Sequence, residues 1–124
     1  MKNQAIQTVV GFLVGRDAIY LNDIQHDYTK RMVSFVGEIN AGLATKYEGS
    51  AKWLGYQITF KGVGAVSMTE LDCYEQERDL VSSFDLVIQP RRKGFSESSK
   101  QFVFATYDHV FELIAIDYAF EIAK

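Results

Sequence analysis

The stretch Trp53–Lys61 reads WLGYQITFK, and it is the clearest structural signal in the chain. Leu54, Tyr56, Ile58 and Phe60 alternate with Gly55, Gln57, Thr59 and Lys61. Successive side chains of a β-strand point to opposite faces, so this pattern predicts a half-buried strand with one apolar face. Trp53 falls on the other face, where an exposed aromatic ring would be suited to binding. Gly62 then allows a turn or bulge before a second extended piece, Val63–Met68.

Outward from this stretch, several other segments have the alternation or the composition of strands. Asp117–Ile122 alternates as cleanly as Trp53–Lys61. Aromatic and β-branched residues favour strands, and Pro90 would end one of them because proline lacks a ladder donor. A Gly-containing loop at Gly15–Asp17 predicts a hairpin. The remaining strands predicted on these grounds are Gln101–Tyr107, Phe84–Gln89 and the hairpin pair Gln7–Val14 and Ala18–Ile24.

Two segments fit either a helix or a strand. Within 28–43 the apolar residues fall at spacings of three and four, which is typical of a helix, yet Val33–Val36 suits a strand. We expect a strand over Arg31–Ile39 followed by a short helix or turn. Segment 109–116 is apolar on nearly every side, and its continuation into an alternating segment favours a strand. The predicted fold is mainly β: about seven or eight antiparallel strands in a sandwich, rolled sheet or open barrel, with at most one or two short helices.

Composition places the chain among globular proteins. Its 124 residues, 48% hydrophobic and 23% charged, fit a single domain over residues 1–124. Cys73 is the only cysteine, which excludes an intrachain disulfide, and we expect it to be a small buried residue in a cytoplasmic protein. The longest apolar run near the start, Val9–Val14, is too short to span a bilayer. A net charge of −3 argues against nucleic-acid binding, although Arg91–Lys93 is a basic cluster.

The second half of the chain carries an acidic stretch, Glu70–Asp79, with the sequence ELDCYEQERD. Its spacing fits no EF-hand calcium loop, because Asp and Asn do not recur at alternate positions ahead of a glycine. A solvated loop or a surface for a basic protein partner remain the two interpretations. The binding residues predicted from the sequence are Trp53, Glu70, Asp72, Glu75, Glu77 and Asp79.

The two histidines, His26 and His109, each lie next to an aspartate. Neighbours on a strand point to opposite faces, so neither pair forms a dyad by sequence alone. No serine lies in a nucleophile elbow and no phosphate-binding glycine loop is present, so the sequence predicts no catalytic group, metal site or cofactor.

The functional hypothesis that follows is a non-catalytic binding protein, either an inhibitor, an immunity-type factor or a regulatory factor. Its size, acidity and aromatic content resemble those of some toxin-neutralising immunity proteins, a likeness of composition that transfers no site residue. Two alternatives stay open. One is a small enzyme or ligand carrier with a pocket near Asp108, His109 and Glu112, joined by His26. The other is a structural subunit that only forms homo-oligomers, for example a homodimer.

Overall fold

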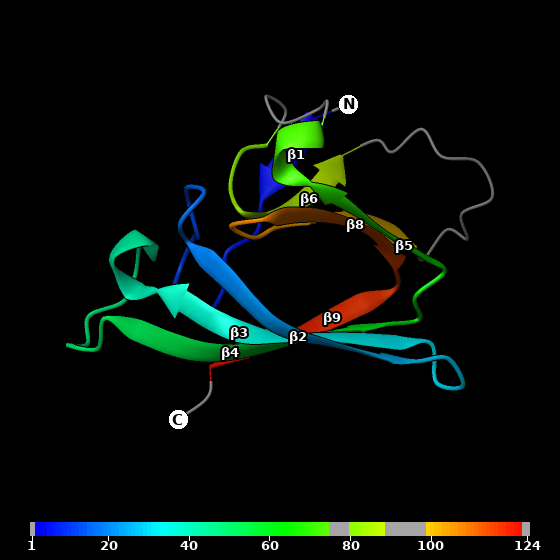
Figure 1. The fold of residues 1–124 in the computed structure, drawn as a ribbon, viewed down its shortest axis with the longest axis horizontal. Helices are drawn as coiled ribbons and strands as arrows, with labels where there is room; N and C mark the ends of the chain where they lie inside the picture. Colours follow the sequence, from blue (N-terminus) through cyan, green and yellow to red (C-terminus); the bar gives the residue numbers. More distant parts are fainter. Residues whose placement is uncertain (1, 75–79, 89–98, 123–124) are drawn as a thin grey trace.

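The chain folds into two antiparallel β-sheets that lie face to face, as the computed structural model shows for residues 2–74, 80–88 and 99–122 (Figure 1). In spatial order, the five-stranded sheet contains β1 (Lys2–Ala5), β6 (Phe84–Ile88), β7 (Lys100–Ala105), β8 (His109–Ala115) and β5 (Ala65–Glu70). The four-stranded sheet contains β2 (Ile19–Asp27), β3 (Met32–Asn40), β4 (Trp53–Lys61) and β9 (Asp117–Ile122). Two 3₁₀ turns, η1 (Ala41–Leu43) and η2 (Leu71–Cys73), are the helical elements within the described ranges.

The prediction of a mainly β, antiparallel fold is confirmed. Strands β4 and β9 have the bounds that alternation predicts, and both ambiguous segments are strands: β3 is followed by the turn η1, and 109–116 contains β8. Nine strands are described, slightly more than expected. No helix within the described ranges is long and apolar enough to cross a membrane.

The predicted hairpin between Gln7–Val14 and Ala18–Ile24 is wrong in its first arm. Segment 7–14 makes only isolated bridges, Thr8 to Gly11 and Leu13 to Ala44, and the N-terminal strand is β1 instead, paired with β6. The physical reason lies at Gly11, whose φ of +89° turns the chain where a strand would have to continue. The Thr8 hydroxyl donates to the Gly11 carbonyl at 2.8 Å and holds that turn.

Aromatic rings from both sheets fill the space between them. Phe35 on β3 lies 5.2 Å from Phe104 on β7 and 4.9 Å from Phe111 on β8, measured between ring centroids. Phe60 on β4 lies 5.4 Å from Phe102 on β7. These separations are in the range that favours aromatic pairs, and all five rings are buried. The alternation of β4 therefore has its cause in this shared core.

A smaller apolar cluster covers the outer face of the five-stranded sheet. Leu71 of η2 packs there with Val103 and Val110, so the chain after β5 folds back over the sheet. Asp85 is fully buried next to this cluster. Its carboxylate accepts hydrogen bonds from the backbone N–H groups of Val81 and Ser82, from the Ser82 hydroxyl and from the Asn3 amide. These donors compensate the loss of hydration.

Strand β2 contains a bulge between Leu21 and Asp23, which places one extra residue opposite β3. Gly37 lies opposite, and a Cβ atom there would collide with the Tyr20 carbonyl, so glycine permits the close approach. The Tyr56 hydroxyl donates to that same carbonyl at 3.2 Å. Since an extra residue reverses the side-chain alternation, Tyr20 and Asp23 both pair with outward-facing positions of β3, whereas Ile24 pairs with buried Phe35.

Replacing Phe35 by alanine tests the shared core. We expect Phe35→Ala to lower the free energy of unfolding by about 3–5 kcal/mol, because it leaves a cavity between the sheets. The neighbouring substitution Val36→Ala, on the outer face of β3, should cost about 1 kcal/mol or less. Urea denaturation followed by Trp53 fluorescence measures both values, and equal losses would contradict this packing.

Tyr56→Phe tests the buried hydroxyl at the bulge. Burial raises the pKa of Tyr56 well above the ordinary 10, so the folded state favours the neutral phenol. The unfolded state therefore releases its proton first, and the wild-type protein loses stability as pH rises above 10. At neutral pH Tyr56→Phe should be about 1 kcal/mol less stable than the wild-type protein, because it lacks the hydrogen bond to the Tyr20 carbonyl. That difference should shrink and then reverse above pH 10 in urea titrations; a difference independent of pH would refute the assignment.

Candidate functional site

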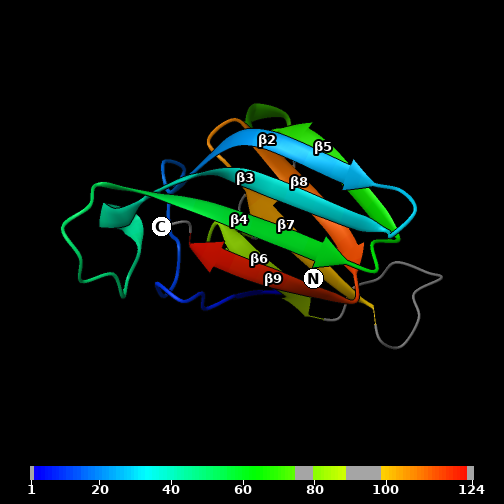
Figure 2. The same cartoon turned by 90° about the horizontal axis from the view of Figure 1, so that it is seen from below.

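A groove runs along the outer edge of the sandwich, between β2 of one sheet and the β7–β8 turn and β5 of the other. Figure 2 shows β2 and β5 at the same edge, with β5 behind β2. At one end the groove is lined by Tyr20, Asp23, Tyr107, Asp108 and His109. It therefore brings together residues that lie more than eighty positions apart in the sequence.

Hydrogen bonds stabilise the β7–β8 turn and join it to β2. The Thr106 hydroxyl donates to the His109 carbonyl at 3.0 Å and accepts from the His109 backbone N–H at 3.2 Å. The Tyr107 backbone N–H donates to the Ile19 carbonyl at 2.9 Å, which joins the two sheets at this end. Side chains on the turn are thus fixed relative to those on β2.

Three aromatic side chains form a partly exposed cluster at this end of the groove: Tyr20, Trp53 and Tyr107. Tyr20 stacks on Tyr107, with ring centroids 5.2 Å apart, and meets Trp53 edge-on at 5.3 Å. Trp53 is 41% exposed and Tyr107 38% exposed. Large rings that remain accessible while their positions are fixed by one another are typical of binding surfaces. We call these three residues the aromatic cluster.

Arg16 already lies against this cluster. Its guanidinium carbon is 5.1 Å from the centre of the Tyr107 ring, and its Nε donates to the Tyr107 carbonyl at 3.2 Å. Arg16 also pairs with Asp72 at 3.6 Å. The contact demonstrates that a face of the aromatic cluster accepts a cation.

Negative charge surrounds Tyr20. Partial burial raises the pKa of its hydroxyl, and the nearby Asp17 carboxylate, Tyr107 and the Asp108 carboxylate raise that pKa further. A raised pKa of this kind means that the neighbouring groups disfavour an added negative charge. Desolvation disfavours a charge of either sign, but the Asp17 and Asp108 carboxylates would attract a positive charge placed beside Tyr20.

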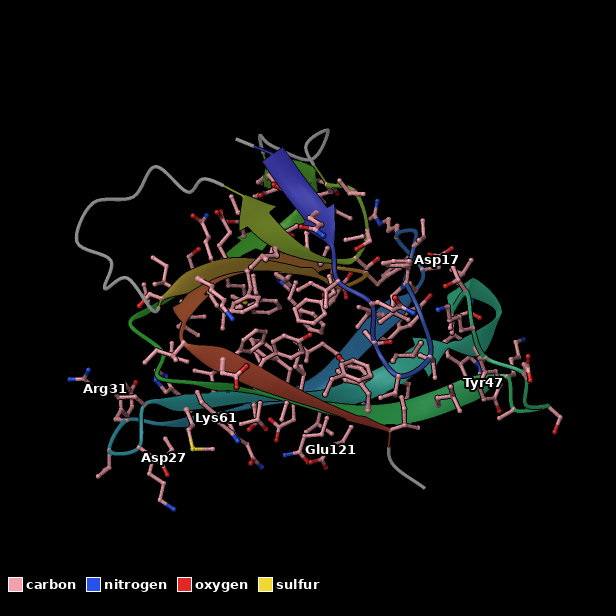
Figure 3. All side chains as sticks on the ribbon, turned by 180° about the vertical axis from the view of Figure 1, so that it is seen from behind. Asp17, Asp27, Arg31, Tyr47, Lys61 and Glu121 are labelled. Carbon is pink, nitrogen blue, oxygen red and sulfur yellow. The ribbon has the colours of Figure 1, made fainter. Side chains whose placement is uncertain are left out.

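The groove continues from this acidic end between β2 and β5, where its lining becomes apolar. Ile24, Met68 and Phe111 belong to both parts, and Val66 lines the second. His26 and Arg31 lie near the far end. There the Val63 backbone N–H donates to the Arg31 carbonyl at 2.9 Å and joins the sheets again. Figure 3 shows Asp17 and Arg31 toward opposite ends of the molecule.

The structure places the residues predicted from the acidic stretch in different positions. Glu70 is exposed at the end of β5, and Asp72 is exposed in η2 and paired with Arg16. Glu75, Glu77 and Asp79 lie outside the described residues, as does the basic cluster 91–93.

Trp53 is exposed on the face predicted for it. The expectation that Cys73 is buried is wrong, because η2 presents the thiol to solvent while Leu71 fills the apolar cluster.

The pocket predicted near Asp108, His109 and Glu112 is only partly formed. Asp108 and His109 line the groove, but Glu112 lies on the opposite face of β8 and accepts a hydrogen bond from the Gln101 amide at 3.3 Å. His26 lies in the other half of the groove, with its ring 4.2 Å from that of Tyr28. Among residues 2–74, 80–88 and 99–122, no three His, Cys, Asp or Glu side chains gather in a possible metal site.

Sequence reasoning missed three residues that complete the groove, Tyr20, Asp23 and Tyr107, and also Asp17 close to Tyr20. Tyr20 and Asp23 share a side only because of the bulge, which the amino-acid pattern does not reveal. Tyr107 reaches Tyr20 through contact between two sheets. The one available signal was the position of Tyr107 at the end of a predicted strand, just before Asp108 and His109, since the loops that follow strands carry many binding residues.

Comparisons of this chain with protein-family models, with curated protein sequences and with solved structures each gave no match.

The charge around Tyr20 can be tested by titration. We expect Asp108→Asn to lower the pKa of the Tyr20 hydroxyl, because it removes a carboxylate that disfavours the phenolate. Asp27→Asn, at the far end of β2, should leave that pKa unchanged. Carbon-13 NMR of labelled tyrosine rings between pH 8 and 12 gives both values. The same pKa in both variants would contradict the placement of Asp108.

Proposed function

We propose that the chain is a non-catalytic binding protein that recognises a basic segment of a protein partner, as an inhibitor, an immunity-type factor or a regulatory factor does. The aromatic cluster carries this proposal, because its rings are exposed beside carboxylates. A guanidinium or ammonium group placed there would contact aromatic faces and negative charge together. The exposed thiol of the single cysteine is consistent with work in a reducing compartment such as the cytoplasm.

The groove differs from an ordinary acidic surface in the rigidity of its parts. The Thr106–His109 turn fixes Tyr107 and Asp108, and the bulge with the Tyr56 hydrogen bond fixes Tyr20 and Asp23. Binding therefore requires little ordering of the protein, which lowers the entropic cost of association. Long-range attraction by the net negative chain would also speed the encounter with a basic partner.

A hexa-arginine peptide serves as a defined probe of this proposal, with hexa-glutamine as its uncharged counterpart. Trp53 is the only tryptophan, so its fluorescence reports on the aromatic cluster alone. We expect hexa-arginine to change the Trp53 emission, hexa-glutamine to leave it unchanged, and the affinity for hexa-arginine to fall with added salt. Asp108→Asn should weaken binding about five- to tenfold, since it removes a charge beside the cation.

Glu121→Gln provides the matched control. It removes one exposed carboxylate from β9, at the other edge of the four-stranded sheet (Figure 3). We expect it to change the affinity less than twofold. Equal weakening by Asp108→Asn and Glu121→Gln would show that the peptide responds only to net charge, and the proposal would fail.

A further inference from the structure

The groove is a slot of defined length between two sheet edges. Among the described strands, β2 and β5 are the outermost members of their sheets on this side. The hydrogen bonds from Tyr107 to Ile19 and from Val63 to Arg31 join the sheets at the two ends of the slot. Between these closures β5 extends over Ala65–Glu70, or roughly 20 Å at 3.3 Å per residue. An extended segment of about six residues matches that length.

Edge strands present backbone N–H and C=O groups that have no partner within the sheet. Strand β2 uses the Ile19 carbonyl to hold the Tyr107 turn, and it continues past the bulge to Asp27. An extended segment can pair with such an edge, and this mode of recognition supplies affinity through backbone hydrogen bonds and specificity through alternate side chains.

The middle part of the slot has apolar walls. Ile24 and Val66 are each 40% exposed and Met68 is 60% exposed, although the pairing register directs all three toward the interior. Buried Phe35 and Phe111 form the floor. A large apolar side chain inserted here would cover these surfaces, and burial of that area would stabilise the complex.

Charge distinguishes a separate partner from a second copy of this chain. Asp23 and Asp108 flank one end of the slot, and Asp27 lies further along β2. Full antiparallel overlap of two β2 edges would place Asp23, the central residue of β2, opposite its own copy, which is unfavourable. A segment with a cationic side chain at the acidic end meets no such repulsion.

We propose that the slot binds an extended segment of the basic partner, about six residues long, which adds to the edge of β2. One Arg or Lys side chain occupies the end with Asp23, Asp108 and the aromatic cluster, and one large apolar side chain lies between Ile24 and Met68. The inference rests on the proposed function and specifies its recognition motif. Asp23 faces outward and Ile24 faces the interior, so the basic and the apolar side chain lie on opposite faces of the added strand. Because only alternate residues of a strand share a face, the basic and the apolar residue are separated by an odd number of positions.

The test uses eight-residue peptides of serine and threonine that contain one arginine and one leucine. The leucine lies two, three or four positions before or after the arginine, and a further set carries alanine in place of leucine. Isothermal titration calorimetry measures the affinities. We expect a spacing of three to bind about tenfold more tightly than spacings of two or four or than the alanine peptides.

Met68→Ala probes the slot itself, with Val9→Ala as the matched control at another exposed apolar residue. Met68→Ala should remove most of the advantage of leucine over alanine, whereas Val9→Ala should leave that advantage unchanged. Equal affinity at all spacings, or an unchanged leucine advantage in Met68→Ala, would overturn the slot even if hexa-arginine binds. Failure of hexa-arginine itself would refute the proposed function as well. A stable homodimer in light scattering that Met68→Lys dissociates would show that a second copy fills the slot, which also overturns the inference.

Discussion

Packing of aromatic rings between the two sheets is the interaction on which the rest of this structure depends. Phe35 and Phe60 of the four-stranded sheet meet Phe104 and Phe102 of the other, and each ring excludes water from its neighbours. Tyr118 of β9 adds contacts at the far edge, 5.1 Å from Phe84. The edge formed by β2 and β5 has smaller apolar side chains instead of aromatic rings, namely those of Ile24, Val66 and Met68. The sheets are consequently well filled on one side and leave a slot on the other.

The core also determines the geometry of the surface above it. Tyr56 packs in the interior, yet its hydroxyl holds the carbonyl of Tyr20 at the bulge. Gly37 allows β2 to approach closely enough for that contact. The bulge then reverses the alternation, so Tyr20 and Asp23 face outward while Ile24 faces the slot. The same few residues therefore belong to the core and support the binding surface, so packing of the core positions the side chains of that surface.

The two ends of the groove differ in charge. Asp17, Asp23 and Asp108 gather near the aromatic cluster, and Arg31 lies toward the far closure. Arg16 contacts Tyr107 and Asp72, so it partly neutralises the side of the cluster that faces η2. The accessible carboxylates then lie on the groove side. This arrangement favours a basic, extended partner and supports the proposed role in binding.

Sequence alone determined the elements whose cause is local. One face of β4 and of β9 packs on the core and the other faces solvent, which gives each strand an alternation with a period of two. The sequences WLGYQITFK and DYAFEI therefore suffice to predict the bounds of these strands and the exposure of Trp53. The mainly β class follows from many such strands. Tertiary structure alone decided the remainder: Gly11 turns a segment that resembles a strand, a bulge reverses β2, and Tyr107 reaches Tyr20 from the opposite sheet. These features arise from contacts between distant segments, whose free energies no local pattern of residues encodes.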